Sequence, residues 1–455
     1  MRAVAALLFA LVSPGAVLAQ TPPPGEIPAL HDIAAAPSAA RIEADITTLV
    51  GFGTRHTLSE TESETRGIGA ARRWIHAEFE RISAACGGCL EVMYVSDVVT
   101  APRIPEPTEV VSVIAVQRGT ADPNRYVIMS GDIDSRVRDV MNATDDSPGA
   151  NDNASGVAGT LEAARVLTQH RFPATIVYAA LAGEEQGLNG GAILAAHAQR
   201  EGWRIQAVLN NDMIGNSAGI NGVIDNTTAR VFAEGTRMTE TPDEARQRRF
   251  TGGEVDSPSR NLARYIEQVG ERYVPNLDVM MIYRLDRFGR GGHHRPFNDL
   301  GYPGVRIMET NEHNDRQHQD LRNEGGRHYG DTLEYVDFDY AAKLTGLNAV
   351  ALAGMAWAPP PPADVTIEGA VSPDTTLKWS RPPDAQAPNL AGYRLYWRLT
   401  TEPQWTHSRW VGDVTEFTLR NVVIDNYFFG VAAVADNGAE SPVVFPGAAG
   451  GFGGY

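Results

Sequence analysis

The sequence has 455 residues, which is enough for two domains of ordinary size. Its 39 lysines and arginines against 56 aspartates and glutamates give a formal net charge of -17. That charge argues against a nucleic-acid partner, because phosphates require a basic surface. After residue 20 no stretch is apolar for long enough to cross a bilayer, so we expect no membrane span.

Residues 1–19 have the pattern of a secretory signal peptide. Arg2 precedes an apolar run from Ala3 to Val12, and small residues stand just before Gln20. A membrane anchor fits less well, because the run is too short and a Pro-Gly pair interrupts it. We therefore expect cleavage after Ala19 and a mature protein that is secreted or periplasmic.

A Pro-rich leader, residues 20–40, precedes two amphipathic helical patterns. Ile42, Ile46 and Leu49 share one helix face, and a second apolar periodicity runs from Arg66 to Ile82. The only cysteines, Cys86 and Cys89, then form a Cys-Gly-Gly-Cys segment ahead of a predicted strand. In an exported protein this spacing predicts a small disulfide-closed turn, since a zinc site would need a second cysteine pair.

From Val110 onward, predicted strands alternate with predicted helices, including a helix over Gly156 to Leu167. The alternation predicts an open, mostly parallel α/β sheet flanked by helices, within a domain of residues 41–357. The strands expected in this domain are 111–116, 126–129, 175–181, 207–209 and 304–308.

The composition changes at the four consecutive prolines 359–362, which predict a stiff spacer. Short β-rich runs recur beyond it and predict a small β-sandwich over residues 358–446, followed by a disordered Gly-rich tail, 447–455. Trp379, the Gly-Tyr-x-x-Tyr-Trp strand 392–397 and the late Tyr427 strand resemble those of a fibronectin type III domain.

Acidic residues cluster where predicted strands end. They are Asp132 and Asp134, Asp152, Glu184 and Glu185, and Asp212. Ligands of open α/β sheets bind outside the carboxyl ends of the strands, so we expect these side chains to converge. Gathered carboxylates would repel one another unless a divalent cation neutralised them. The pattern therefore predicts a metal site at this edge of the sheet.

The order Gly-x-x-Asp-Ser, Pro-Gly-Ala-x-Asp-x-Ala-Ser-Gly, Glu-Glu-x-Gly-Leu and Asp-Met resembles the co-catalytic zinc exopeptidases over Val110 to Tyr340. That family includes secreted leucine aminopeptidases, glutamate carboxypeptidases and glutaminyl cyclases. The resemblance implies two divalent metal ions, preferably zinc, bridged by Asp152. It implies that Glu185 and a late histidine complete one site, that Asp212 completes the other, and that Glu184 is the general base. It also implies that Asp134 orients a ligand.

Two positions depart from the family pattern. Asp132 stands where the family has histidine, so one site is all oxygen and could take manganese, magnesium or calcium, or be weak or missing. The late histidine is either His318, which we prefer for its spacing, or His328, which lies one residue too close to Asp331-Thr332. A Gly-Gly-His-His-Arg-Pro-Phe segment is also similar to the family's and would place His294 near the substrate.

The leading functional hypothesis is an exported aminopeptidase acting on peptide substrates. A carboxypeptidase or dipeptidase is the close alternative, because a cluster of arginines could bind a substrate carboxylate: Arg284, Arg287, Arg290 and Arg295. Glutaminyl cyclase is less favoured, because a cyclase works with one metal. A non-catalytic binding protein with a degenerate site is the third alternative, although retention of Glu184 argues against it. The sandwich would attach or space the enzyme, with a surface or polymer as its partner.

Overall fold

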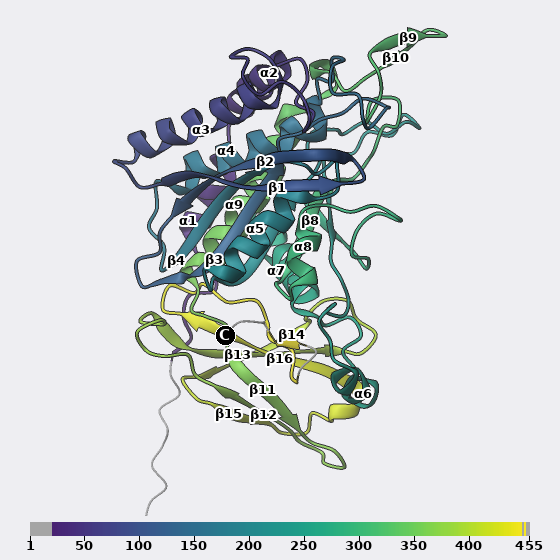
Figure 1. Ribbon diagram of the computed structural model, residues 1–455. Helices are drawn as coiled ribbons and strands as arrows, with labels where there is room; N and C mark the ends of the chain where they lie inside the picture. The colour runs from purple at the N-terminus through teal and green to yellow at the C-terminus, as the bar shows by residue number, and fades with distance from the viewer. Residues whose placement is uncertain (1–20, 448–449, 452–455) are drawn as a thin grey trace, which may run out of the picture.

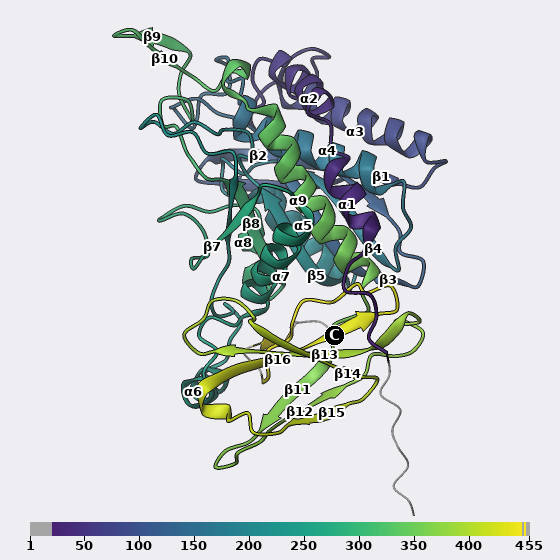
Figure 2. The ribbon, with the colours of Figure 1, turned by 180° about the vertical axis from the view of Figure 1, so that it is seen from behind.

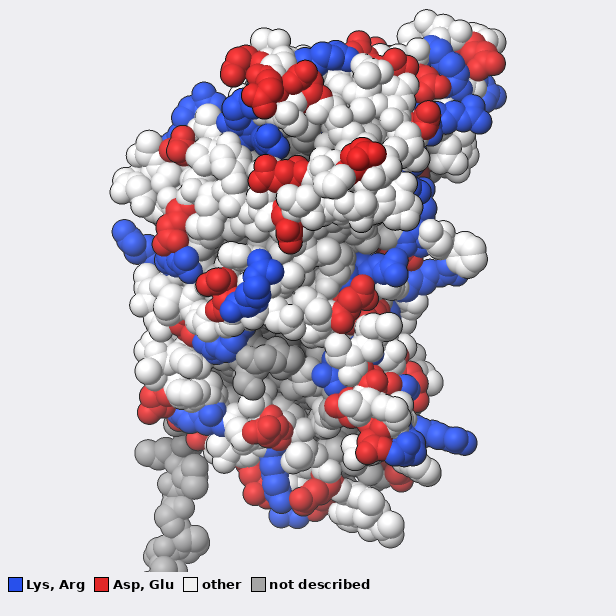
Figure 3. Space-filling model, in the orientation of Figure 1, with Lys and Arg blue, Asp and Glu red and all other residues white. Residues whose placement is uncertain are grey.

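The computed structural model describes residues 21–447 and 450–451. The predicted signal peptide, and residues 448–449 and 452–455 of the predicted tail, lie outside the described residues. Figure 1 shows a large sheet covered by helices, with a smaller β-rich unit beneath it. Within the described part of the chain, no helix has the length and apolar character needed to span a bilayer. On the face drawn in Figure 3, acidic and basic side chains are interspersed.

The large unit is built on one eight-stranded sheet with the order β1-β2-β4-β3-β5-β8-β6-β7. Strands β4, β3, β5 and β8 run parallel at its centre. The antiparallel pairs are β1 with β2, β2 with β4 and β6 with β8, whereas β7 runs parallel to β6. The strands are β1 (Glu91–Ala101), β2 (Ile104–Gln117), β3 (Asp122–Asp132), β4 (Ala174–Leu181), β5 (Arg204–Asn211), β6 (Thr228–Phe232), β7 (Asp278–Ile282) and β8 (Gly304–Glu309).

Helices cover both faces of this sheet. Figures 1 and 2 show α5 and α8 on one face, and α4 and α9 with α1 on the other. The helices are α1 (Pro28–Ala35), α2 (Ala39–Gly51), α3 (Gly67–Ala85), α4 (Gly156–Leu167), α5 (Asn189–Arg200), α6 (Pro242–Thr251), α7 (Pro258–Tyr273), α8 (His294–Asp299) and α9 (Phe338–Trp357), with short turns η1 (Ala150–Ser155), η2 (Leu333–Tyr335) and η3 (Ile424–Asn426).

The structure confirms the predicted α/β class, because each predicted pattern forms the expected element. The apolar stripe Ile42, Ile46 and Leu49 is fully buried on α2. Strand β4 is buried along its whole length, as a central parallel strand must be when helices cover both of its faces. Cys86 and Cys89 form the predicted disulfide at the end of α3. The predicted Pro-rich leader contains a helix, α1, over residues 28–35.

The smaller unit consists of two three-stranded antiparallel sheets, β11-β12-β15 and β14-β13-β16. They enclose a separate apolar core around Trp379, Tyr393, Leu395 and Val431. A hairpin, β9 (Arg322–Glu324) with β10 (Arg327–Tyr329), projects from the opposite end of the molecule (Figure 1). The strands of the smaller unit are β11 (Ala363–Glu368), β12 (Thr375–Ser380), β13 (Leu390–Leu399), β14 (His407–Gly412), β15 (Glu416–Leu419) and β16 (Tyr427–Ala435).

The two units are packed together, and the four prolines that join them lie within this packing. All four prolines, 359–362, are buried. Asp256, in the segment before α7, is 0% exposed and accepts hydrogen bonds from Arg264 of α7 and from Arg398 of β13. A buried carboxylate held by one arginine from each unit ties the sandwich to the large domain.

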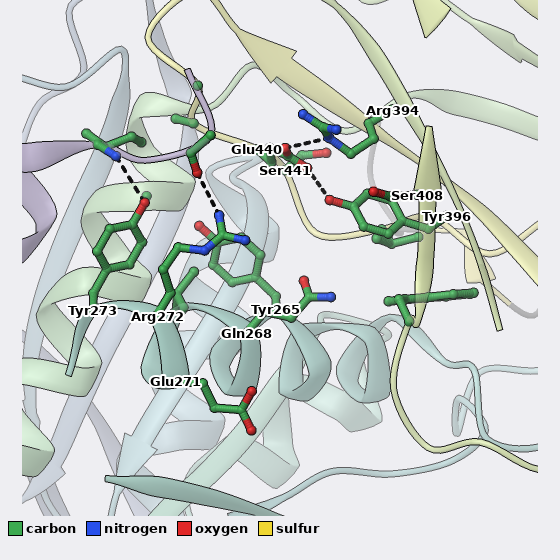
Figure 4. A pocket seen from close by; sticks show the side chains of 18 of the residues that line it. Tyr265, Gln268, Glu271, Arg272, Tyr273, Arg394, Tyr396, Ser408, Glu440 and Ser441 are labelled. Atoms are coloured by element: carbon green, nitrogen blue, oxygen red, sulfur yellow. Dashed lines mark hydrogen bonds and ion pairs between the residues drawn. The ribbon is translucent and has the colours of Figure 1, made fainter. Parts of the chain in front are cut away.

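A cavity of about 580 Å³ lies between α7 and the sandwich (Figure 4). Glu440 lines the cavity on the side of the sandwich. It accepts hydrogen bonds from Arg394 Nε at 2.9 Å and from the Tyr396 hydroxyl at 2.5 Å. On the other side Arg272 donates to the carbonyl of Gly25. The sandwich also meets the first residue of β5, where Arg204 donates to Gln386. The sandwich therefore contacts the amino ends of the parallel strands, opposite the end where the acidic residues lie.

Candidate metal centre

The carboxyl ends of three adjacent parallel strands carry the acidic residues. Asp132 is the last residue of β3, Glu184 and Glu185 follow β4, and Asp212 follows β5. Close backbone packing allows the remaining loop to join them. A Cβ on Gly131 would lie 2.2 Å from the carbonyl carbon of Gly156, so only glycine lets the end of β3 approach the start of α4. That approach brings the turn η1, with Asp152, to the same edge of the sheet.

Three of the predicted ligands converge. His318 Nε2 lies 2.8 Å from Asp152 Oδ2 and 2.8 Å from Glu185 Oε1. The three ligand atoms all lie within 4.8 Å of one another. Two carboxylates and an imidazole form a donor set that suits zinc, and three protein ligands leave a coordination position open, as in catalytic zinc sites.

The structure places His318, and not His328, at this centre. His328 lies on the exposed hairpin strand β10. His318 adopts a left-handed backbone conformation, with φ 54°, as does Met213 beside Asp212, with φ 65°. Non-glycine residues in this region carry strain that surrounding structure must hold, and such residues cluster at functional sites. Burial lowers the pKa of His318, but the charges of Glu185 and Asp152 outweigh burial and raise that pKa to about 9.

A surrounding layer of hydrogen bonds orients these ligands. Asp331 Oδ2 accepts from the backbone amide of Asp152 at 2.6 Å. Arg136 donates to Glu185 Oε2 at 2.6 Å and lies 2.6 Å from His318 Nδ1, which turns Nε2 of that ring toward the carboxylates. Asp134 accepts from the backbone amides of both Glu184 and Glu185. Asp134 therefore holds the backbone of the loop that carries the predicted base, which is how a residue behind the ligands supports a metal site.

Glu184 is the one acidic side chain of this loop that is left free. Its carboxylate makes no hydrogen bond or ion pair to any residue that the structure describes, whereas Glu185 is held by Arg136 and His318. Burial raises the pKa of Glu184 well above its usual range, and the charges of Glu185 and Asp212 raise it further. A carboxylate with free oxygens and raised basicity, next to a metal ligand, can accept a proton from water.

Asp132 and Asp212 lie near the centre but are bound to other side chains. His293 Nδ1 lies 2.5 Å from Asp132 Oδ1, and Asn153 Nδ2 donates to Asp132 Oδ2 at 2.7 Å. Arg306 Nη2 lies 2.6 Å from Asp212 Oδ2. Burial raises the pKa of Asp132 and of Asp212 to about 7, an effect that Arg306 opposes in both cases.

The two histidines of the His-His segment have different surroundings. His294 is fully buried, and its Nε2 lies 2.8 Å from the carbonyl oxygen of Leu285 and 3.8 Å from Asp286 Oδ2. The preceding residue, His293, contacts Asp132 instead. Arg136 and Arg306 were also missed. A signal for Arg306 existed, because a charged residue inside a predicted buried strand needs a buried partner.

The α/β sheet, the converged carboxylate–imidazole ligands and the free glutamate define a metallopeptidase hydrolase. A family model for peptidase family M28 matches residues 112–324. A probable zinc metalloprotease of Leptosphaeria maculans is 46% identical over 413 residues, which cover 90% of this chain and 94% of the relative. A second, from Pyricularia oryzae, is 46% identical over 414 residues, covering 90% of this chain and 82% of the relative. The chain belongs to peptidase family M28.

Solved structures share the fold at lower identity. The LapA aminopeptidase of Legionella pneumophila is 20% identical and superposes with a TM-score of 0.52 over 76% of each chain. LapB of the same organism is 20% identical, with a TM-score of 0.51 over 72% of this chain and 75% of its own. At this identity the two matches show the fold of the catalytic domain.

Proposed function

We propose that this protein is an exported, zinc-dependent exopeptidase that releases N-terminal residues from peptides, with Glu184 as its general base. The single observation that carries the proposal is the pairing of a converged ligand set with a free glutamate. Asp152, Glu185 and His318 would hold the zinc, and the unpaired carboxylate of Glu184 follows directly in the same loop.

Zinc, when bound, supplies a Lewis acid that polarises the scissile carbonyl and favours the deprotonated form of water. Glu184 takes the proton that the attacking water loses and gives it to the amine that leaves. Asp134 keeps the base in place, because its two oxygens bind the amides of residues 184 and 185 at 3.1 and 2.9 Å. Arg136 and Asp331 hold the ligand side chains and backbone.

The charges around the centre favour an amino-terminal substrate over a carboxyl-terminal one. A carboxypeptidase needs an arginine that is free to bind the substrate's carboxylate. Arg287 is paired with Glu312 at 2.9 Å, Arg136 with Glu185, and Arg306 with Asp212 and Asp286. Arg316, beside Asp152, is held by Asn216 Oδ1 at 2.7 Å and by the ring of Tyr335. Glu184 has no side-chain partner among the residues that the structure describes, and its carboxylate would attract an ammonium group.

Export rests on the signal-like residues 1–19 and is supported by the Cys86–Cys89 disulfide, a bond typical of oxidising compartments. We propose further that the C-terminal sandwich is fibronectin type III-like. Its partner would be a surface or polymer outside the cell. A second metal ion beside Asp132 and Asp212, as the sequence predicted, is the alternative form of the centre, and the metal content of the protein decides between the two forms.

Three variants of the purified mature protein test the role of Glu184. Glu184→Gln removes the proton acceptor but no zinc ligand, so we expect hydrolysis to fall by about 100- to 10,000-fold with zinc content unchanged. His318→Ala should lose zinc and activity together. His328→Ala is the matched control on the exposed hairpin and should lose neither. Undiminished turnover by Glu184→Gln would exclude it as the base.

Substrate class is tested with paired peptides whose N-termini are free or acetylated, after zinc has been restored to metal-stripped protein. Cleavage of the free peptides alone establishes an aminopeptidase, and cleavage of the acetylated ones indicates a carboxypeptidase. Because a single converged ligand set also suits a cyclase, the peptides include one with N-terminal glutamine. Loss of ammonia from that peptide without hydrolysis would identify a cyclase, and no reaction with any peptide would favour a binding protein.

A further inference from the structure

The second metal site predicted from the sequence does not assemble. It required Asp132, Asp152 and Asp212 to bring oxygens together around one ion. Among the residues that the structure describes, only Asp152, Glu185 and His318 place ligand atoms within 4.8 Å of one another. Asp132 and Asp212 are buried, at 1% and 3% exposure, so their positions depend on the side chains packed around them.

Asp132 is held by hydrogen-bonding side chains on both of its oxygens. His293 and Asn153 bind Oδ1 and Oδ2 at 2.5 and 2.7 Å, and Asn210 Nδ2 lies 3.5 Å from Oδ1. His293 and Asn153 are almost completely buried and cannot swing into solvent. The aspartate that replaces the family's histidine is therefore satisfied by protein atoms.

Asp212 is held by a permanent positive charge. Arg306 extends from the middle of β8, is 0% exposed, and reaches Asp212 Oδ2 at 2.6 Å. The same guanidinium is fixed by Asp286 Oδ1 at 3.1 Å and by the carbonyl of Gly291 at 3.0 Å. Arg287 Nη2 adds a second cation 3.9 Å from Asp212 Oδ2. A divalent cation bound at Asp212 would lie next to a buried guanidinium that cannot move away, and the two would repel each other.

The geometry points to a centre that binds one metal ion. The Arg306 guanidinium supplies, next to Asp212, the positive charge that a second metal ion would otherwise supply. Arg306 is a positioning residue: it neutralises Asp212, fixes the loop after β5 and excludes a second cation. The inference rests on the proposed zinc site of Asp152, Glu185 and His318 and gives its stoichiometry. A single ion held there would supply the Lewis acid, and among the described residues of this loop Glu184 is the acidic side chain that has no hydrogen-bond or ion-pair partner.

Metal binding to the full mature protein tests the inference without any activity measurement. Protein stripped with a chelator is titrated with zinc by calorimetry, and metal retained after gel filtration is counted by mass spectrometry. We expect one tightly bound zinc per chain. The protein that holds one zinc is then titrated with manganese and its metal is counted again, because oxygen ligands suit manganese. Tight uptake of a second ion of either metal would overturn the inference.

Two variants test the part assigned to Arg306. Arg306→Met removes the charge while keeping length and should raise the tightly bound metal from one to two per chain. Arg306→Lys keeps the charge and should stay at one. A folded Arg306→Met protein that still binds one ion would show that the charge does not exclude the second.

If Arg306→Met fails to fold, titration of the wild type with cobalt still measures how many ions bind. The visible absorption of the bound cobalt should stop changing after one equivalent. Further change during a second equivalent would overturn the inference. This test and the test of the proposed function can fail separately. A protein that binds two metal ions and cleaves peptides would contradict the one-metal inference alone. A one-metal protein that cleaves none sinks the peptidase assignment alone.

Discussion

At the level of single residues, the chain buries many carboxylates, and Glu234 is one whose charge is poorly compensated. It follows β6, and Ser259 Oγ lies 3.5 Å from its Oε1. Burial raises the pKa of Glu234 to about 7, which the nearby charge of Asp299 reinforces. In the unfolded chain the group has an ordinary pKa of about 4.3. The folded state therefore favours the protonated form.

The consequence for stability has a definite sign. Glu234 contributes fully below pH 4, and its contribution is lost as the pH rises to about 7, with no further loss above that value. Glu234→Gln mimics the protonated form at every pH. We expect the variant to match the wild type near pH 4 and to be more stable at pH 8 by about 1–3 kcal/mol. Urea unfolding of both proteins at the two pH values measures this, and an equal difference at both would contradict it.

The sequence predicted residues of the centre where they belong to a local motif, and missed them where they do not. Asp152, Glu184 and Glu185 stand in short patterns directly after strands, so their position follows from the sheet. His318 comes from a long loop and was only preferred to His328. Arg306 and His293 act through partners 94 and 161 residues away, at the carbonyl of Asp212 and at Asp132. Spacing along the chain cannot reveal such pairs.

At the level of elements, Arg55 connects the segment after α2 to the loops of the metal centre. Its side chain is 1% exposed and donates to the carbonyls of Leu49, Ile133, Pro148 and Gly149 at 2.6 to 3.1 Å. Burial lowers its pKa to about 10, so it remains charged at neutral pH. One guanidinium thus joins the end of α2, the segment after β3 and the turn before Asp152.

Replacing Arg55 should destabilise the loops that carry the proposed metal ligands. Arg55→Met leaves four buried carbonyls without their donor, so we expect lower thermal stability and zinc affinity reduced by about 10- to 100-fold. Competition with a chromophoric chelator measures the affinity. Arg66→Met is the control, since Arg66 binds the same region through the carbonyl of Thr144 but its side chain is 43% exposed. Equal effects of the two variants would show that the buried guanidinium of Arg55 has no special role in holding the metal-binding loops.

The elements themselves were predictable because their apolar periodicities are long and regular. Helix α4 has the predicted bounds Gly156–Leu167, and the central strands extend the predicted cores by a few residues. The turn η1 and the hairpin β9–β10 were not predicted. Neither contains an apolar repeat: η1 is shaped by hydrogen bonds of Asp331 to its backbone, which join residues far apart in the sequence.

At the level of the whole molecule, the sandwich and the catalytic domain share a buried ionic contact. Arg398 donates to both oxygens of Asp256, at 2.8 and 3.0 Å, and the side chains are 1% and 0% exposed. Removing one partner of a buried pair leaves charge uncompensated. We expect Arg398→Met to lower the free energy of unfolding by about 3 kcal/mol, even though Arg264 still binds Asp256.

Calorimetry of the full chain measures this change and the number of transitions. Because the pair joins the two units, we expect one shared unfolding transition in the wild type and separation into two in Arg398→Met. Arg420→Met, which removes an exposed pair with Asp374, is the control and should cost less than about 1 kcal/mol. A single transition shifted equally in both variants would contradict the coupling.

The segment between β7 and α8 connects the two ends of the molecule. Near its start the hydroxyl of Tyr283 lies 3.4 Å from the carbonyl of Pro403 in the sandwich, and at its end His293 binds Asp132. Between them, Asp286 fixes Arg306. The sandwich is consequently not an exchangeable module. A chimera with a foreign C-terminal domain would need residues equivalent to Pro403 and Arg398. Without them, the segment between β7 and α8 would lose its contact with the C-terminal domain.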